Sequence, residues 1–233
     1  MTRPALIGLD GRSGSGKTVL AAALAARIAP FARVEVIEIE SMYQGWDGLA
    51  AAVGDDGPYP AVVRALRERG TATWTTWDWH RAAPGPPRWT APADVVVCEG
   101  VGALSTAARP LLDLAVWLEL ETPARRTRAL ARDGETFAPH WDRWAAQEED
   151  YLARHAPRAA ADLVLSEGGA GNLITEGLMA LSPDWLAERL RRQTHAPPRA
   201  SPSSTTSAAK PEEPRQNGLL RFEAMTQNGD PDR

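Results

Sequence analysis

Short apolar runs alternate along the chain with segments of helical spacing. The near-continuous apolar runs are typical of strands covered on both faces, and they predict strands over Ala5–Leu9, Val34–Ile39, Asp94–Cys98, Leu114–Leu120 and Asp162–Leu165. Helical spacing, often with proline near the first turn, predicts helices over Thr18–Ile28, Pro60–Arg69, Pro123–Arg132, Pro139–Arg154 and Pro183–Arg192. Such alternation predicts an α/β domain whose sheet is mostly parallel, with helices on both faces. Thr71–Trp79 is either an extra strand or part of a substrate lobe.

The end of the chain has a different composition. From Ala196 to Arg233, proline, serine, threonine, alanine and charged residues dominate, and apolar periodicity is weak. Segments of this kind cannot bury enough apolar surface to fold alone. We predict one folded domain over residues 1–195 and a disordered tail over residues 196–233.

Composition excludes several classes of protein. The 233 residues are 43% hydrophobic and 24% charged, and no apolar run approaches the roughly 20 residues that a membrane span requires. The formal net charge of −4 offers no broad basic surface for nucleic acid. A single cysteine, Cys98, excludes an internal disulfide, and the N-terminus lacks the pattern of a secretory signal. We therefore expect a cytoplasmic protein that binds neither membranes nor nucleic acid.

A phosphate-binding loop lies between the first predicted strand and the first predicted helix. The segment Gly11-Arg12-Ser13-Gly14-Ser15-Gly16-Lys17-Thr18 fits the pattern G-x-x-x-x-G-K-[ST] in the strand–loop–helix context that this P-loop requires. Its glycines let backbone N–H groups point at phosphate, and the helix N-terminus adds partial positive charge. We expect Gly11, Ser13, Gly14, Ser15 and Gly16 to cradle nucleotide phosphates. Lys17 would reach the β/γ-phosphates, and Thr18 would place its hydroxyl on Mg²⁺.

Two carboxylates follow predicted strands and should meet the P-loop at one sheet edge. Glu99 ends the apolar run Val95-Val96-Val97-Cys98, and Glu40 follows Val34–Ile39. In a parallel sheet both emerge at the carboxyl edge, where ligands bind. We predict that Glu99 serves the metal and that Glu40 is the general base or hydroxyl-orienting group. Otherwise Glu40 holds a metal-bound water or caps the following turn.

Arginines and aromatic residues complete the set of candidates. Arg125, Arg128 and Arg132 share one face of the predicted helix Pro123–Arg132. Such a face forms either a lid that stabilises transferring phosphate or a solvated surface. Tryptophans beside carboxylates suit a flat hydroxylated acceptor; the alternative is that the acidic residues only cap helices or turns. The acceptor candidates are Trp46, Asp47, Trp77, Asp78 and His80.

The segment Ile7–Thr18 resembles the opening of the uridine kinase-like P-loop kinases. Further segments follow in that family's order: Glu40-Ser41-Met42-Tyr43 in place of Asp-Ser-Phe-Tyr, Trp77-Asp78-Trp79 in place of Tyr-Asp-Phe, and Ala93–Gly100 with its terminal Glu-Gly. The resemblance covers residues 5–166. Within the family, the chain is most similar to a poorly characterised bacterial branch, whose characteristic segment resembles Tyr43-Gln44-Gly45-Trp46-Asp47-Gly48-Leu49. It implies a P-loop NTPase fold, an arginine-bearing lid helix, and substrate contact by Tyr43 and Arg125.

These features together predict an ATP- and Mg²⁺-dependent kinase with Lys17, Glu40, Arg128 and Arg132 as catalytic residues. It would transfer the γ-phosphoryl group to a hydroxyl of a small molecule, with a uridine- or cytidine-like nucleoside as the default acceptor. Glutamate in place of the family's aspartate at position 40 and a short segment between Tyr43 and Trp77 depart from the nucleoside-binding pattern. The alternatives are a nucleotide-binding ATPase or regulatory switch without an acceptor, and a non-catalytic nucleotide-binding protein.

Overall fold

A computed structural model describes residues 3–166 together with residues 175, 177, 179 and 181. The predicted helix Pro183–Arg192 and the predicted tail lie outside the described residues. Among the helices that are described, none is both long and apolar enough to cross a bilayer.

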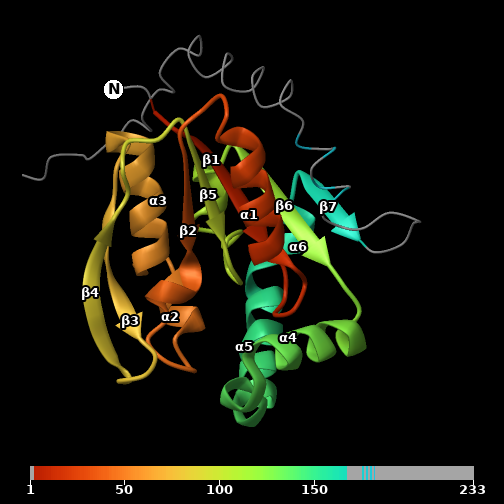
Figure 1. Ribbon diagram of the computed structural model, residues 1–233. Helices are drawn as coiled ribbons and strands as arrows, with labels where there is room; N and C mark the ends of the chain where they lie inside the picture. The colour runs from red at the N-terminus through yellow and green to blue at the C-terminus, as the bar shows by residue number, and fades with distance from the viewer. Residues whose placement is uncertain (1–2, 167–174, 176, 178, 180, 182–233) are drawn as a thin grey trace, which may run out of the picture. The chain divides into compact units, whose positions relative to one another are not determined.

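Five parallel strands form the central sheet in the order β2-β5-β1-β6-β7, and Figure 1 shows them running side by side. All five correspond to predicted strands, and no strand end differs from its predicted position by more than one residue. Their bounds are β1 Ala5–Asp10, β2 Val34–Glu38, β5 Val95–Glu99, β6 Leu114–Glu119 and β7 Leu163–Ser166. The predicted α/β fold with a parallel sheet is confirmed.

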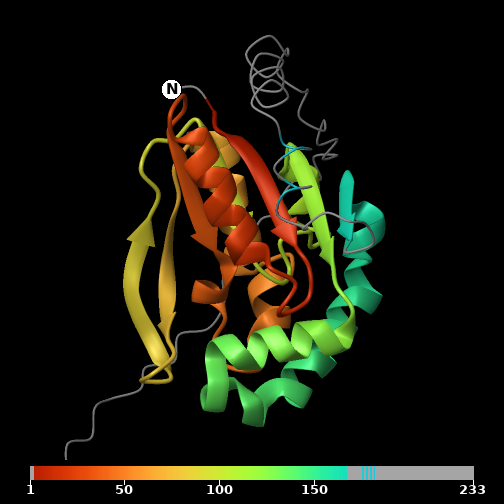
Figure 2. The same cartoon turned by 45° about the vertical axis from the view of Figure 1, so that its right-hand side comes forward.

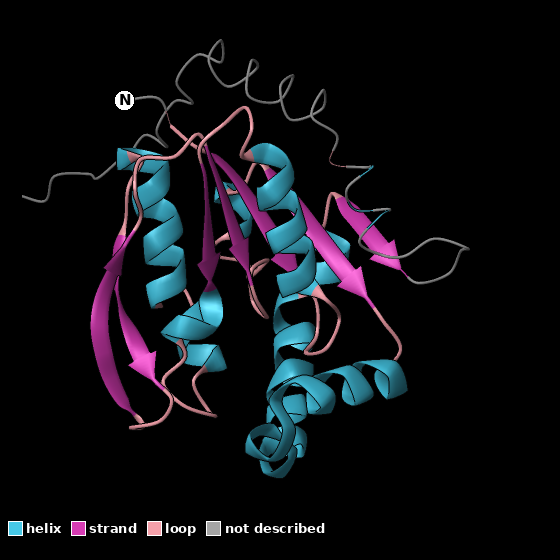
Figure 3. Ribbon diagram, viewed as in Figure 1, coloured by secondary structure: helices cyan, strands magenta, loops and turns pink. Residues whose placement is uncertain are grey.

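Helices and short 3-10 turns connect the strands (Figure 3). The α-helices are α1 Lys17–Ile28, α2 Leu49–Val53, α3 Pro58–Arg69, α4 Thr122–Phe137, α5 Trp141–His155 and α6 Pro157–Ala160. The 3-10 turns are η1 Ile39–Met42, η2 Arg109–Leu111 and η3 Ala138–His140. The sequence pattern does not predict α2, whose five residues are too few to show helical periodicity.

The two faces of the sheet bury different helices because side chains alternate along each strand. Val95 and Val97 of β5 pack in one apolar cluster with Leu20 of α1, whereas Val96 and Cys98 pack in a second cluster with α2, α3 and α5. Fully burying one such aliphatic side chain contributes about 1.5–3 kcal/mol. This two-sided core explains the continuous apolar runs, and it leaves the loops at the carboxyl ends of the strands to form a site.

A separate antiparallel ribbon joins β3 Thr73–Asp78 with β4 Ala83–Trp89, and Figures 1 and 2 show it beside α3. Of the two alternatives for Thr71–Trp79, β3 confirms the extra strand. The pattern does not predict β4, because its sequence APGPPRW contains three prolines. Proline is tolerated there because β4 pairs with β3 alone, so no second neighbour needs its missing N–H group.

The predicted arginine-bearing helix extends further than its sequence pattern indicates. α4 continues past Arg132 to Phe137, with a break at Gly134, whose φ of 55° and ψ of −136° are not helical. Glycine adopts positive φ without steric cost. Figure 2 shows α4 and α5 crossing below the carboxyl ends of the strands, which brings both helices to the edge where the P-loop lies.

Candidate active site

The P-loop occupies its predicted place between β1 and α1. Gly14 has a φ of 81°, and a Cβ atom there would lie 2.1 Å from the backbone oxygen of Arg125. Gly16 precedes α1 with a φ of 99°. Lys17 is buried, and its Nζ donates to the backbone oxygens of Gly11 at 2.8 Å and Arg12 at 3.2 Å. Burial lowers the pKa of Lys17, while the negative charges of Glu99 and Glu148 oppose this effect.

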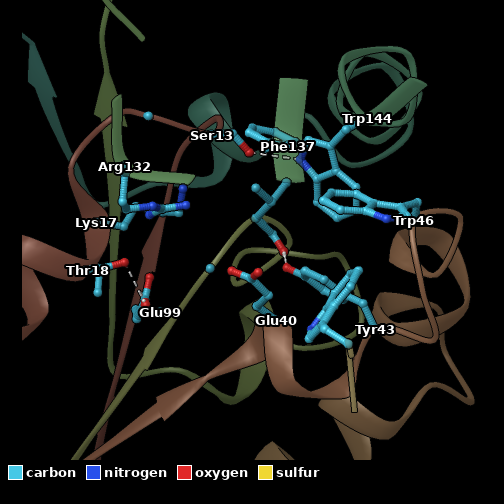
Figure 4. Close-up of a pocket in the computed structure, with 14 residues that line it drawn as sticks. Ser13, Lys17, Thr18, Glu40, Tyr43, Trp46, Glu99, Arg132, Phe137 and Trp144 are labelled. Atoms are coloured by element: carbon cyan, nitrogen blue, oxygen red, sulfur yellow. Dashed lines mark hydrogen bonds between the residues drawn. The ribbon is translucent and has the colours of Figure 1, made fainter. Parts of the chain in front are cut away.

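Thr18 and Glu99 meet at the mouth of this loop. The Thr18 hydroxyl donates to Glu99 Oε1 at 3.0 Å, as Figure 4 shows. Burial raises the pKa of Glu99, and the charge of Lys17 and the Thr18 hydrogen bond counteract it. Within the described part of the chain, no three or more His, Cys, Asp or Glu side chains are grouped so that they could hold a metal ion by themselves. Two hard oxygen donors beside a phosphate cradle fit Mg²⁺, which usually keeps waters and shares its coordination with substrate phosphates.

A cavity of about 380 Å³ opens from this pair (Figure 4). Its polar side is formed by Ser13, Gly14, Lys17, Thr18, Glu40, Glu99 and Arg132. Its other wall is formed by Tyr43, Trp46, Trp79, Gly100, Val101, Phe137 and Trp144. P-loop residues, two carboxylates and an aromatic chamber therefore share one space.

Trp46 is the centre of the aromatic wall. Its ring stacks on Phe137, with ring centroids 5.6 Å apart and ring planes 12° apart, and on His140, with centroids 4.3 Å apart and planes 17° apart. It also makes an edge-on contact with Trp79 at a centroid distance of 5.0 Å. Gln147 of α5 also donates a hydrogen bond to the Trp46 backbone oxygen. These contacts hold the loop before α2 against α4 and α5.

Glu40 and Tyr43 flank the cavity from the turn that follows β2. Glu40 lies in the first turn of η1 and reaches the cavity, facing the same space as Lys17 and Glu99 in Figure 4. Tyr43 is buried, and its hydroxyl donates to the backbone oxygen of Val101 at 2.6 Å. Burial and the charge of Glu40 raise the pKa of Tyr43. Tyr43 thus fixes the turn that carries Glu40.

The three arginines of α4 have different environments, although their spacing predicts one common face. Arg132 is exposed but reaches the cavity, and its positive charge opposes the rise that burial causes in the pKa of Glu99. Arg128 is exposed and does not line the cavity. Arg125 is buried and donates to the backbone oxygens of Leu120 at 3.0 Å and Ser13 at 3.1 Å. Arg125 therefore supports the P-loop from behind, because its guanidinium is taken by backbone carbonyls, and the structure does not place it against an acceptor.

Four other candidates for acceptor contact lie outside this cavity. Asp47 forms an ion pair with Arg143, whose Nε lies 2.6 Å from Asp47 Oδ1, and this bond lowers the pKa of Asp47. Asp78 accepts the backbone N–H groups of His80 and Arg81, each at 3.0 Å, so it caps a turn. His80 is exposed, and Trp77 does not line the cavity. Short acidic residues in turns resemble site residues in sequence, and here an ion pair with α5 occupies Asp47 and a local turn occupies Asp78.

Sequence reasoning missed several residues that shape the site. Trp79, Phe137 and Trp144 line the cavity without having been candidates. Asp10 is fully buried and accepts the backbone N–H groups of Gly11 at 2.7 Å, Gly102 at 3.1 Å and Leu104 at 2.9 Å. A polar residue at the end of an apolar strand, directly before the P-loop, was the available signal for Asp10. No local signal marks Phe137 or Trp144, because they reach the site through the packing of α4 and α5 against Trp46.

The parallel sheet, the P-loop and the Thr18–Glu99 pair define the class of P-loop nucleotide-binding folds. Comparison with solved structures agrees. A protein from Bacillus stearothermophilus described as a possible uridine kinase superposes with a TM-score of 0.50 at 19% identity, covering 70% of this chain and 89% of that one. A protein from Silicibacter sp. TM1040, provisionally assigned as a fructose transport system kinase, superposes with a TM-score of 0.51 at 21% identity. The match covers 70% of this chain and 90% of that one. At these identities the likeness establishes the fold alone.

Curated sequences give a more specific relationship. The chain is 26% identical over 200 residues to a uridine kinase of Lactobacillus helveticus, covering 76% of this chain and 93% of the relative. It is 27% identical over 188 residues to a uridine kinase of Latilactobacillus sakei, covering 71% and 87%. No family model matches the chain. The predicted resemblance to the uridine kinase-like P-loop kinases is confirmed.

Proposed function

We propose that this protein is an ATP- and Mg²⁺-dependent kinase that phosphorylates a hydroxyl group of a small molecule. The observation that carries the proposal is the single cavity in which Lys17, the Thr18–Glu99 pair and Glu40 face an aromatic chamber. An enzyme that only hydrolyses nucleotide needs no second chamber. The relatives named uridine kinase support the same activity, and a nucleoside is accordingly the first acceptor to test.

The residues of the cavity divide the work of phosphoryl transfer. Backbone N–H groups of the P-loop and the Lys17 ammonium would bind the phosphates, while Thr18 and Glu99 would hold Mg²⁺, which neutralises charge on the β- and γ-oxygens. Arg132 would stabilise the charge that develops on the transferring group, and the aromatic wall would exclude water. Arg128 does not line the cavity, so its catalytic role stays a prediction from the sequence.

Glu40 would orient the acceptor. The acceptor oxygen forms a bond to the γ-phosphorus as the bond to the bridging oxygen breaks, ADP leaves, and the hydroxyl proton passes to the Glu40 carboxylate. The transition state of such transfers is loose in most analyses, so positioning supplies much of the rate. A carboxylate at the turn after β2 can therefore act chiefly by holding the hydroxyl in line.

A screen of nucleosides, sugars and vitamin precursors for acceptor-stimulated release of ADP tests the proposal. One acceptor should raise ADP release well above the rate in its absence, and Lys17→Ala should abolish the increase while far-ultraviolet circular dichroism stays unchanged. Lys17 acts on ligand phosphate rather than filling the core. ADP release that no acceptor stimulates would instead favour an ATPase or switch, and undiminished transfer by Lys17→Ala would refute the P-loop assignment.

A further inference from the structure

α5 supplies the P-loop with a buried carboxylate that has no place in the proposed chemistry. The Glu148 side chain is 2% exposed. Its Oε1 accepts the backbone N–H of Ser13 at 2.7 Å and the Nε1–H of Trp144 at 3.1 Å, and its Oε2 accepts Nε–H of Arg12 at 2.9 Å. Arg125 Nη1 lies 3.9 Å from the same Oε2. Both oxygens thus accept hydrogen bonds from N–H donors, and Oε2 also faces a second guanidinium.

The same helix turn connects this carboxylate to the aromatic chamber. Trp144 and Ser13 both line the cavity. The indole Nε1–H of Trp144 lies 2.8 Å from Ser13 Oγ as well as 3.1 Å from Glu148. A continuous set of hydrogen bonds therefore runs from the acceptor wall through Trp144 to the P-loop.

The P-loop needs such anchors because of its composition. Gly11, Gly14 and Gly16 all have positive φ, and glycine loses more conformational freedom on ordering than any other residue. Ser13 is held on two sides: Arg125 of α4 donates to its backbone oxygen at 3.1 Å, and Glu148 of α5 accepts its N–H at 2.7 Å. The two helices thus fix the Ser13 peptide from outside the loop, in addition to the hydrogen bonds that Lys17 makes to the backbone oxygens of Gly11 and Arg12.

We propose that Glu148 is a positioning residue, which fixes the Arg12–Ser13 segment for phosphate binding and holds the Trp144 wall in register with it. The inference rests on the proposed function and adds a residue outside the P-loop on which nucleotide affinity depends. Small displacements of reacting groups cost large factors in rate, so one carboxylate that places both the loop and the wall would set the geometry between nucleotide and acceptor.

Glu148→Gln is the direct test, with Glu149→Gln as its matched control. Glutamine replaces one carboxylate oxygen by an NH₂ group, which must face either Ser13 and Trp144 or the arginines, all of them donors. Glu149 also pairs with Arg12, but its side chain is 63% exposed. Calorimetric titration with MgADP, well below the thermal midpoint of each variant, needs no acceptor. We expect Glu148→Gln to weaken MgADP binding about tenfold, the worth of one charge-assisted hydrogen bond, and Glu149→Gln to leave it unchanged.

Trp144→Phe provides a second variant that is less disruptive to folding. It keeps an aromatic ring at the wall but removes the Nε1–H, so we expect MgADP binding to weaken about threefold. Because both residues act on Ser13, the double variant should lose less than the product of the two single factors. A purely structural role would lower the thermal midpoints and leave the affinity of the folded protein unchanged.

The outcomes separate this inference from the proposed function. MgADP affinity in Glu148→Gln within about twofold of the wild type overturns the positioning role, and so do fully independent effects of the two substitutions. A wild-type protein that does not bind MgADP overturns the proposed function instead.

Discussion

Replacing Tyr151 by Phe should destabilise the protein through a single hydrogen bond to a buried charge. Tyr151 of α5 is 4% exposed, and its hydroxyl donates to Asp10 Oδ2 at 2.6 Å. All four groups that hydrogen-bond Asp10 are donors, so they stabilise its ionised form. A hydrogen bond to a charged group contributes about 1.5–3 kcal/mol. At roughly 2–4 °C per kcal/mol for a chain of this size, the thermal midpoint should fall by about 3–12 °C.

Tyr59→Phe is the matched control for this prediction. Tyr59 is also buried, but its hydroxyl donates to a neutral group, the backbone oxygen of Ala103, at 2.9 Å. A neutral hydrogen bond contributes about 0.5–1.5 kcal/mol, so its loss should lower the midpoint by about 1–6 °C. Differential scanning calorimetry of both variants measures the difference. Equal losses at neutral pH would refute the reasoning that Asp10 is ionised in the folded protein.

The pH dependence of the Tyr151→Phe effect gives a second check. Burial raises the pKa of Asp10, while the Tyr151 hydrogen bond lowers it. The raised pKa in the folded state means that stability present at acid pH is lost as pH rises through that pKa. Removing the hydroxyl raises the pKa of Asp10 further and enlarges this loss. The destabilisation caused by Tyr151→Phe should therefore be larger at pH 7 than at about pH 4, near the ordinary pKa of aspartate. An effect that grows as pH falls would contradict this sign.

Three further predictions concern the cavity. Thr18→Ala and Glu99→Gln should each raise the Mg²⁺ concentration needed for half-maximal rate, and unchanged Mg²⁺ titrations would point to another ligand. Since burial raises the pKa of Glu99, protons should begin to compete with Mg²⁺ at a higher pH than for an exposed glutamate. Arg132→Ala should lower kcat by at least about tenfold with little change in ATP binding, whereas the exposed Arg126→Ala should have no effect; loss of ATP affinity alone would make Arg132 a ground-state ligand. Glu40→Gln should cut kcat by at least about 10²-fold with Glu35→Gln near normal, and near-normal turnover of Glu40→Gln would rule out the base.

The sheet and the phosphate site were predictable because local signals specify them. Apolar runs such as Val95-Val96-Val97 mark strands buried on both faces, and the P-loop joins a strand to a helix at fixed spacing. The pairing of Thr18 with Glu99 follows from strand ends that share one edge of a parallel sheet. In these cases the sequence pattern alone predicts the strands, and the parallel topology then places their ends at one edge of the sheet.

The acceptor side was less predictable because it depends on contacts between distant segments. Asp47 looks like a site residue, yet it pairs with Arg143 across 96 positions. Arg125 shares a helical face with Arg132, but nearby carbonyls of Ser13 and Leu120 capture its guanidinium. Trp144 and Glu148 reach the site only because α5 packs against the P-loop, and no short sequence motif predicts that packing.

The fate of the γ-phosphate tests the central claim most directly. ATP labelled at the γ-position, Mg²⁺ and the protein are incubated with each acceptor of the panel, and the products are separated into inorganic phosphate and organic phosphate. The account predicts label in the phosphate ester of one acceptor, formed in step with ADP and lost in both Lys17→Ala and Glu40→Gln. Label that appears only as inorganic phosphate, at a rate that no acceptor changes, would contradict it.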